Sequence, residues 1–82
     1  MISGNTINDS SYQGLLLSFG KQISNLTLTN DTFAGAGTWG IDISNVTGSM
    51  SATDVTVSGT GSGALNNPGG YTINRGPGDS GF

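Results

Sequence analysis

Two short patterns of alternating apolar and polar residues recur along this chain. The first reads Asn or Asp, apolar, Thr, apolar, then Thr or Ser, and it occurs at residues 25–29 and 54–58, with a weaker copy at 4–8. The second reads Gly, apolar, any residue, apolar, then Ser, and it occurs at residues 14–18 and 40–44, with a degraded copy at 63–67. Apolar residues two positions apart are typical of strands that bury one face. The patterns predict two kinds of short β-strand that alternate along the chain, and no helix.

The spacing of the copies predicts stacked repeats. Units that recur every 20 to 30 residues or so are typical of solenoids, in which each strand pairs with its equivalent in the next repeat. Equivalent apolar residues should then lie side by side: Leu15 with Ile41, Leu17 with Ile43, Leu26 with Val55, and Leu28 with Val57. This register leaves residues 31–39 as the longest corner loop. An alternative register aligns residues 2–6, 23–27 and 43–47 instead, and places 45–47 where the first register has 54–58.

The repeats stop near residue 67. Residues 66–70 (NNPGG) are a cluster of turn-forming residues, and 71–74 predict one last strand before a Gly-rich tail. A stacked-repeat protein needs an atypical terminal unit to cover its last repeat. We therefore divide the single small domain into repeats at 1–67 and a C-terminal closing segment at 68–82.

Composition excludes several classes of function. The chain has 82 residues, a net charge of −3 and only two cationic residues, so it lacks the basic patch that nucleic-acid binding requires. It has no apolar run near 18 residues and no cysteine, and residues 1–5 do not begin a signal peptide. Its low content of large aliphatic residues is near that of disordered chains, but the low net charge and the regular apolar spacing argue against disorder. Because the chain opens inside a recurring pattern, we expect a fragment of a longer solenoid.

These features together resemble the final coils of a right-handed parallel β-helix of the pectate-lyase-like superfamily. The resemblance rests on the alternating strand patterns, on Asn25 and Asn45 at expected corners, and on the closing residues 76–82, and it covers about residues 2–74. It implies an all-β fold of about three coils. Members of this superfamily are mostly extracellular and act on polysaccharides as hydrolases or lyases, so the resemblance also implies an extracellular location and a polysaccharide partner. The acidic cluster of such catalytic sites is not visible in this sequence.

Asp42 is the one carboxylate in the middle of a confidently predicted strand. Because Ile41 and Ile43 should face inward, Asp42 should face outward, with Leu16 before it and Asn66 (or Leu65) after it in the neighbouring coils. Glycoside hydrolysis generally uses two carboxylates, and neither neighbour is acidic. A solvated surface carboxylate is therefore expected, with a catalytic role for Asp42 as the alternative.

The other candidate residues have simpler explanations. Asp9, Asp31 and Asp54 fall at strand ends, where Asp bonds the nearby backbone, so turn chemistry is favoured over calcium binding. The motif at 78–81 (GDSG) is similar to a serine-protease nucleophile loop, but the chain has no histidine to act as its base. No metal site and no cofactor are predicted.

Trp39 and Tyr12 precede the two best copies of the second pattern and could stack on sugar rings, with corner packing as the alternative. We expect a part of an extracellular β-helix protein that binds or processes polysaccharide, with its catalytic residues elsewhere. The alternative is a structural or adhesive solenoid of a cell surface or a phage, without chemistry. Self-association through open coil edges is expected in either case.

Overall fold

The computed structural model describes residues 2–18, 22–44 and 46–82, and the regular structure of these residues is entirely β. They form parallel sheets in the strand orders β1-β4-β7-β10, β2-β5-β8 and β3-β6-β9, named sheets 1, 2 and 3 below. The strands are β1 (Ile2–Ser3), β2 (Thr6–Asn8), β3 (Leu15–Leu17), β4 (Gln22–Thr29), β5 (Thr32–Ala34), β6 (Trp39–Ile43), β7 (Thr47–Thr53), β8 (Thr56–Ser58), β9 (Gly63–Asn66) and β10 (Thr72–Arg75).

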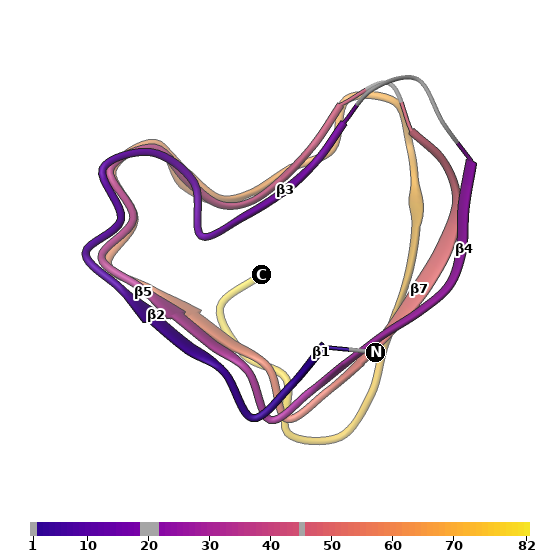
Figure 1. Cartoon of the computed structure of the whole chain (residues 1–82), viewed down its shortest axis with the longest axis horizontal. Helices are drawn as coiled ribbons and strands as arrows, with labels where there is room; N and C mark the ends of the chain where they lie inside the picture. Colours follow the sequence, from indigo (N-terminus) through magenta and orange to yellow (C-terminus); the bar gives the residue numbers. More distant parts are fainter. Residues whose placement is uncertain (1, 19–21, 45) are drawn as a thin grey trace.

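The strands form stacked layers, each of which contributes one strand to every sheet. Residues 2–18 are the first layer and carry β1, β2 and β3, residues 22–44 carry β4, β5 and β6, and residues 46–66 carry β7, β8 and β9. Viewed down the shortest axis, the layers follow nearly the same outline (Figure 1). Because each strand is short, its backbone groups are satisfied mainly by the layers above and below it.

The register predicted for sheet 3 is confirmed. Leu15 pairs with Ile41 and Leu17 pairs with Ile43. The degraded third copy is shifted by one residue, because Trp39 pairs with Gly63 and Ile41 pairs with Leu65.

The preferred register of the first pattern is wrong. Leu28 pairs with Ala52 in sheet 1, and Val57 pairs with Phe33 in sheet 2. Leu26 likewise pairs with Met50 rather than with a residue of 54–58. Each layer contains three strands, not two, since the loop expected at 31–39 includes β5. The same sequence pattern therefore occurs in strands of two different sheets. Aligning its copies paired a strand of sheet 1 with a strand of sheet 2.

The alternative register is also wrong. Thr47 pairs with Gln22, so residues 46–47 do not align with 26–27. Asn25 lies inside β4 rather than at a corner between strands. Its φ is 61°, and the pairing between β4 and β7 shifts around it. Asn45, the other predicted corner residue, lies outside the described residues.

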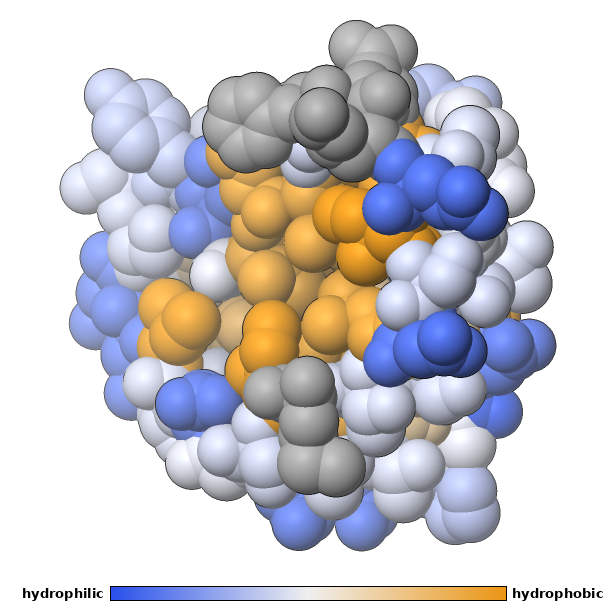
Figure 2. Space-filling view, turned by 45° about the vertical axis from the view of Figure 1, so that its right-hand side comes forward, coloured by the Kyte–Doolittle hydropathy of each residue, from blue (hydrophilic) through white to orange (hydrophobic). Residues whose placement is uncertain are grey.

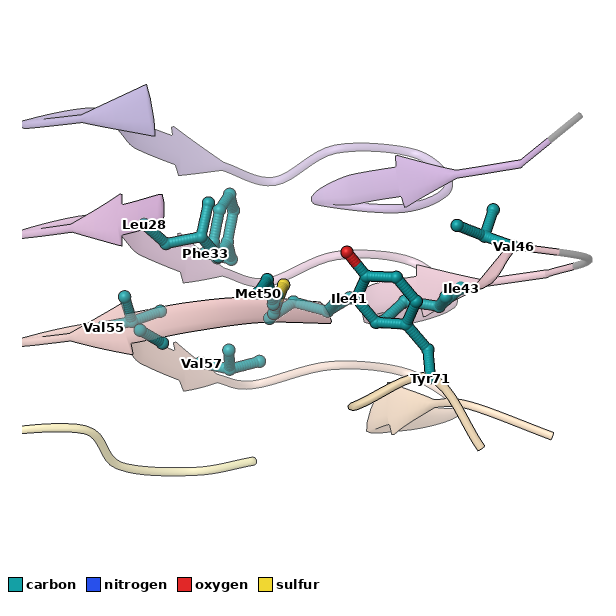
Figure 3. Packing of buried hydrophobic residues seen from close by; sticks show 10 residues of the cluster. Leu28, Phe33, Ile41, Ile43, Val46, Met50, Val55, Val57 and Tyr71 are labelled. Carbon is teal, nitrogen blue, oxygen red and sulfur yellow. The ribbon is translucent and has the colours of Figure 1, made fainter. Parts of the chain in front are cut away.

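Apolar side chains from all three sheets fill the space inside the layers (Figure 3). The most buried side chains of this hydrophobic core include Leu28 and Ile41, which have no exposed surface. Phe33, Ile43 and Met50 are each about 1% exposed. The remaining buried apolar side chains are Val46, Ala52, Val55, Val57 and Tyr71. Strand alternation places Leu28, Ile41 and Ile43 inward, as the sequence patterns predict.

The C-terminal residues cross the end of the stack. The turn at 67–70 is closed by a hydrogen bond from Gly70 N to the oxygen of Asn67, and the predicted last strand is present as β10. The tail then forms a parallel bridge between Ser80 and Thr56, and Phe82 packs against the core and under Arg75. In Figure 1 the C-terminus lies inside the outline of the layers. The proposed division between 67 and 68 stays a prediction.

Candidate functional site

Asp42 lies in the middle of β6, with the neighbours that the sequence predicted. It pairs with Leu16 of the first layer and with Asn66 of the third. Its Oδ1 accepts a hydrogen bond from Asn66 Nδ2 at 3.0 Å, and its Oδ2 accepts one from Gln13 Nε2 at 3.2 Å. The residue is only 9% exposed. The expectation of a solvated carboxylate is therefore wrong, because side chains from three layers meet at this position.

The arrangement makes Asp42 a hydrogen-bond acceptor for two side-chain amides. Leu16 and Asn66 are its neighbours in the stack, so no second carboxylate occupies the adjacent position where a displacement would need one. Both carboxylate oxygens already accept an amide N–H, which holds the side chain in one orientation. Within residues 2–18, 22–44 and 46–82 no group of three or more acidic, histidine or cysteine side chains could hold a metal ion.

Gln13 is the partner that sequence reasoning missed. The hydrogen bonds from Gly14 N to the oxygen of Trp39 and from Thr38 N to the oxygen of Tyr12 place Gln13 beside Trp39 in the stack. The side chain of Gln13 reaches Asp42, 29 residues away. The 26-residue step between the first two layers aligns residue 13 with residue 39, so the spacing alone does not predict the contact with Asp42.

The two aromatic candidates occupy different positions of the repeat. Tyr12 is 70% exposed and pairs through its backbone with Thr38, not with Trp39. Trp39 is partly buried, and its ring lies against Gly63, the residue that follows it in the stack. A Cβ at Gly63 would lie 2.5 Å from the ring, so glycine leaves the space that the indole occupies. The structure therefore does not bring Tyr12 and Trp39 together as one stacked column.

The acidic residues at strand ends act on the backbone in two ways. Asp9 and Asp54 have φ of 57° and 55°, the left-handed conformation that Asp tolerates at turns. Asp31 has no exposed surface and accepts the Asn5 N–H at 2.9 Å. Asp31 therefore bonds the backbone of the neighbouring layer, 26 residues away, rather than the nearby backbone that turn chemistry implies, and its Oδ2 is buried without a hydrogen-bond partner.

Asp79 is a further backbone-binding carboxylate, and it lies in the GDSG motif at 78–81. It accepts N–H groups from Val55 at 2.9 Å and from Gly76 at 2.8 Å. The contact of Asp79 with Val55 is equivalent to that of Asp31 with Asn5. In each case the carboxylate accepts a backbone N–H from the preceding layer. The steps of 26, 24 and 24 residues that link residues 5, 31, 55 and 79 carry this information in the sequence.

No family model, curated protein or solved structure matches the chain. The part of the chain that the structure describes contains no pocket. Among the same residues there is no helix long and apolar enough to cross a membrane. Asp42, Gln13 and Asn66 form a group of side-chain hydrogen bonds that joins all three layers.

Proposed function

We propose that the chain forms about three coils of an extracellular right-handed parallel β-helix protein. This segment binds polysaccharide without converting it to product. The binding surface is the outer face of sheet 3, and any catalytic residues of the protein lie outside this segment. The parallel stacked sheets support the fold, and the hydrogen-bonded group of Asp42, Gln13 and Asn66 beside Trp39 supports the binding surface.

The fixed carboxylate is the observation that carries this proposal. A buried charge is costly unless hydrogen bonds hold it, and two amides hold Asp42 at the edge of solvent. Such an acceptor, fixed in advance, binds a sugar hydroxyl with little loss of conformational entropy. The indole of Trp39 adds an apolar face of the kind that stacks on sugar rings. Trp39 is partly buried and lies in the same strand as Asp42, three residues before it.

Affinity electrophoresis against a panel of plant, algal and microbial polysaccharides tests the proposal. We expect at least one polysaccharide to retard the chain, Trp39→Ala and Asp42→Asn to lose that retardation, and Asn74→Ala to keep it. Asn74 is an exposed residue of β10 in sheet 1 and serves as the surface control. Tyr12→Ala measures whether the second aromatic candidate contributes.

Product assays decide between binding and catalysis. We expect no reducing ends and no unsaturated products from any polysaccharide of the panel, since one carboxylate cannot serve as both partners of a displacement. Product release that disappears in Asp42→Asn would instead make Asp42 a catalytic residue. Retardation that is equal in Trp39→Ala and the parent chain would move the binding surface away from sheet 3.

A structural or adhesive solenoid is the second candidate function, and one observation favours it. All of the exposed large apolar residues that the structure describes, Ile7, Tyr12 and Leu16, belong to the first layer. Exposed apolar side chains gathered on one layer are suited to contact with another β-layer or another protein surface. Absence of retardation by every polysaccharide, together with end-to-end association, would favour this second function.

A further inference from the structure

We propose that the hydrogen-bonded group of Asp42, Gln13 and Asn66 selects polysaccharides whose sugars carry free amino groups, and that it excludes polysaccharides of acidic sugars. This selectivity rests on the proposed function, because it names the class of polysaccharide that the outer face of sheet 3 binds. It follows from the charge of Asp42 and from the acceptors that the two amides leave open.

The two amides beside Asp42 have a determined orientation. A carboxylate only accepts hydrogen bonds, so Gln13 Nε2 and Asn66 Nδ2 face it, and the amide oxygens do not. Within the described residues no hydrogen bond ends on either amide oxygen, and the buried unpaired side-chain atoms are Asp31 Oδ2 and Thr38 Oγ1. Gln13 Oε1 and Asn66 Oδ1 therefore remain open to solvent as acceptors.

The groups that bond Asp42 do not neutralise its charge, since both are uncharged amides. Arg75 is the one cation among the described residues. It lies in β10 of sheet 1, where its Nε donates a hydrogen bond to the oxygen of Phe82. The oxygens that the group offers to a ligand thus belong to one carboxylate and two amides, and all of them are acceptors. A matching ligand supplies hydrogen-bond donors and a positive charge.

The ammonium group of an amino sugar has both properties. Like a lysine side chain it supplies several N–H donors and a positive charge, and a hydrogen bond between charged groups is roughly twice as strong as one between neutral groups. The carboxylate of an acidic sugar would instead meet Asp42 as a like charge and would add acceptors where donors are needed. The net charge of −3 on the chain also repels an acidic polymer before contact.

Apolar contact does not decide between these classes of sugar. The hydrophobic effect is not directional, so the broad apolar area that Figure 2 shows on the molecular surface would contact acidic, neutral and amino sugars alike. The same holds for the indole of Trp39, which offers an apolar face to any sugar ring. The charge and the acceptors around Asp42 are therefore the features that distinguish one class from another.

Isothermal titration calorimetry with oligosaccharides of equal length tests the selectivity. Oligomers of glucosamine, N-acetylglucosamine and galacturonic acid are titrated at physiological ionic strength and at a pH where the glucosamine is protonated. The first two differ only in the acetylation of the amine. The glucosamine oligomer should bind at least about tenfold more tightly than the acetylated one, because its ammonium forms charge-assisted hydrogen bonds with Asp42. The galacturonic acid oligomer should show no measurable binding.

Asp42→Asn should reduce the preference for the glucosamine oligomer to less than about threefold, because the charge is gone. The fold should survive, since Gln13 or Asn66 can turn its amide and accept the new side-chain N–H, and circular dichroism checks this. Asp9→Asn is the matched control. It removes the same charge from an exposed turn residue whose φ of 57° suits Asn as well, and it should change the preference less than about twofold.

The outcomes separate the selectivity from the function on which it rests. An equal loss of preference in Asp9→Asn and Asp42→Asn would show a general attraction to an acidic protein and would overturn the selectivity. Tighter binding of the acetylated or the galacturonic acid oligomer, lost in Trp39→Ala, would also overturn it but would leave polysaccharide binding in place. Absence of binding to these oligomers and to every polysaccharide of the panel would refute both.

Discussion

Replacing Leu28 by alanine tests whether the interior of the stack is packed as the structure shows. Leu28 has no exposed surface and lies between Ile2 and Ala52 in its column of sheet 1. Leu28→Ala removes three carbon groups at about 0.8 kcal/mol each, and the cavity left behind raises the total cost to about 3–5 kcal/mol. A domain of this size is stable by only about 4–12 kcal/mol, so the loss is a large part of its free energy of unfolding.

Leu16→Ala is the matched control, because it makes the same chemical change at a leucine that is 48% exposed. It should cost about 1 kcal/mol or less, since much of the side chain is already in water and no closed cavity forms. Urea titrations followed by circular dichroism, at concentrations where sedimentation shows the monomer, measure both losses. In thermal unfolding Leu28→Ala should lower Tm by more than about 12 °C. Equal losses for the two variants would refute the placement of Leu28 in the core.

A size swap separates the observed register from the one that the sequence pattern suggested. Ala52 is the neighbour of Leu28 in the structure, and it is 1% exposed. The double variant Leu28→Ala, Ala52→Leu keeps the volume of this column nearly constant, so it should recover at least about 1 kcal/mol of the loss caused by Leu28→Ala alone. The same recovery from enlarging Val57, and none from Ala52→Leu, would favour the pattern register instead.

Two further predictions concern hydrogen bonds. Asp79→Ala should lower the free energy of unfolding by about 1–3 kcal/mol in urea titrations, because it leaves the Val55 N–H without its acceptor and removes one of the two acceptors of the Gly76 N–H, which also donates to the oxygen of Ala52; an unchanged urea midpoint would contradict this cap. Tyr71→Phe should cost about 1 kcal/mol in the same titration, since the Tyr71 hydroxyl donates to the oxygen of Ile23 at 2.7 Å. Burial raises the pKa of Tyr71 above its usual value of 10.0, so the folded state keeps the proton that the unfolded state loses. The contribution of Tyr71 is thus fully present below pH 10 and is lost as the pH rises through the folded pKa, and Tyr71→Phe should show a shallower loss of stability above pH 10 than the parent chain.

The strands of sheet 3 were predicted well because their signal is local. The alternation in 14–18 and 40–44 is strong, the step between them contains no competing copy, and Leu15 and Leu17 pair with Ile41 and Ile43 as expected. Leu16, the neighbour of Asp42 in the first layer, followed from the same register, whereas Asn66 depends on the one-residue shift of the third copy. The prediction confused strands of sheets 1 and 2 because β4 and β8 have the same alternation of apolar and polar residues. In the structure β4 packs beside Ala52 and β8 packs beside Phe33. A pattern that repeats in two sheets cannot identify the sheet to which a strand belongs.

The sequence by itself determined that the chain forms short β-strands with Leu28, Ile41 and Ile43 inward, because a period of two is a property of the extended backbone. Only the tertiary structure decided which strands stack in sheets 1 and 2. The surroundings of Asp42 depend in the same way on distant residues. Strand alternation turns its side chain away from Ile41 and Ile43, but its burial requires Gln13 and Asn66, which lie 29 and 24 residues away. The pairing of strands between layers brings these distant residues together, and no local sequence pattern encodes that pairing.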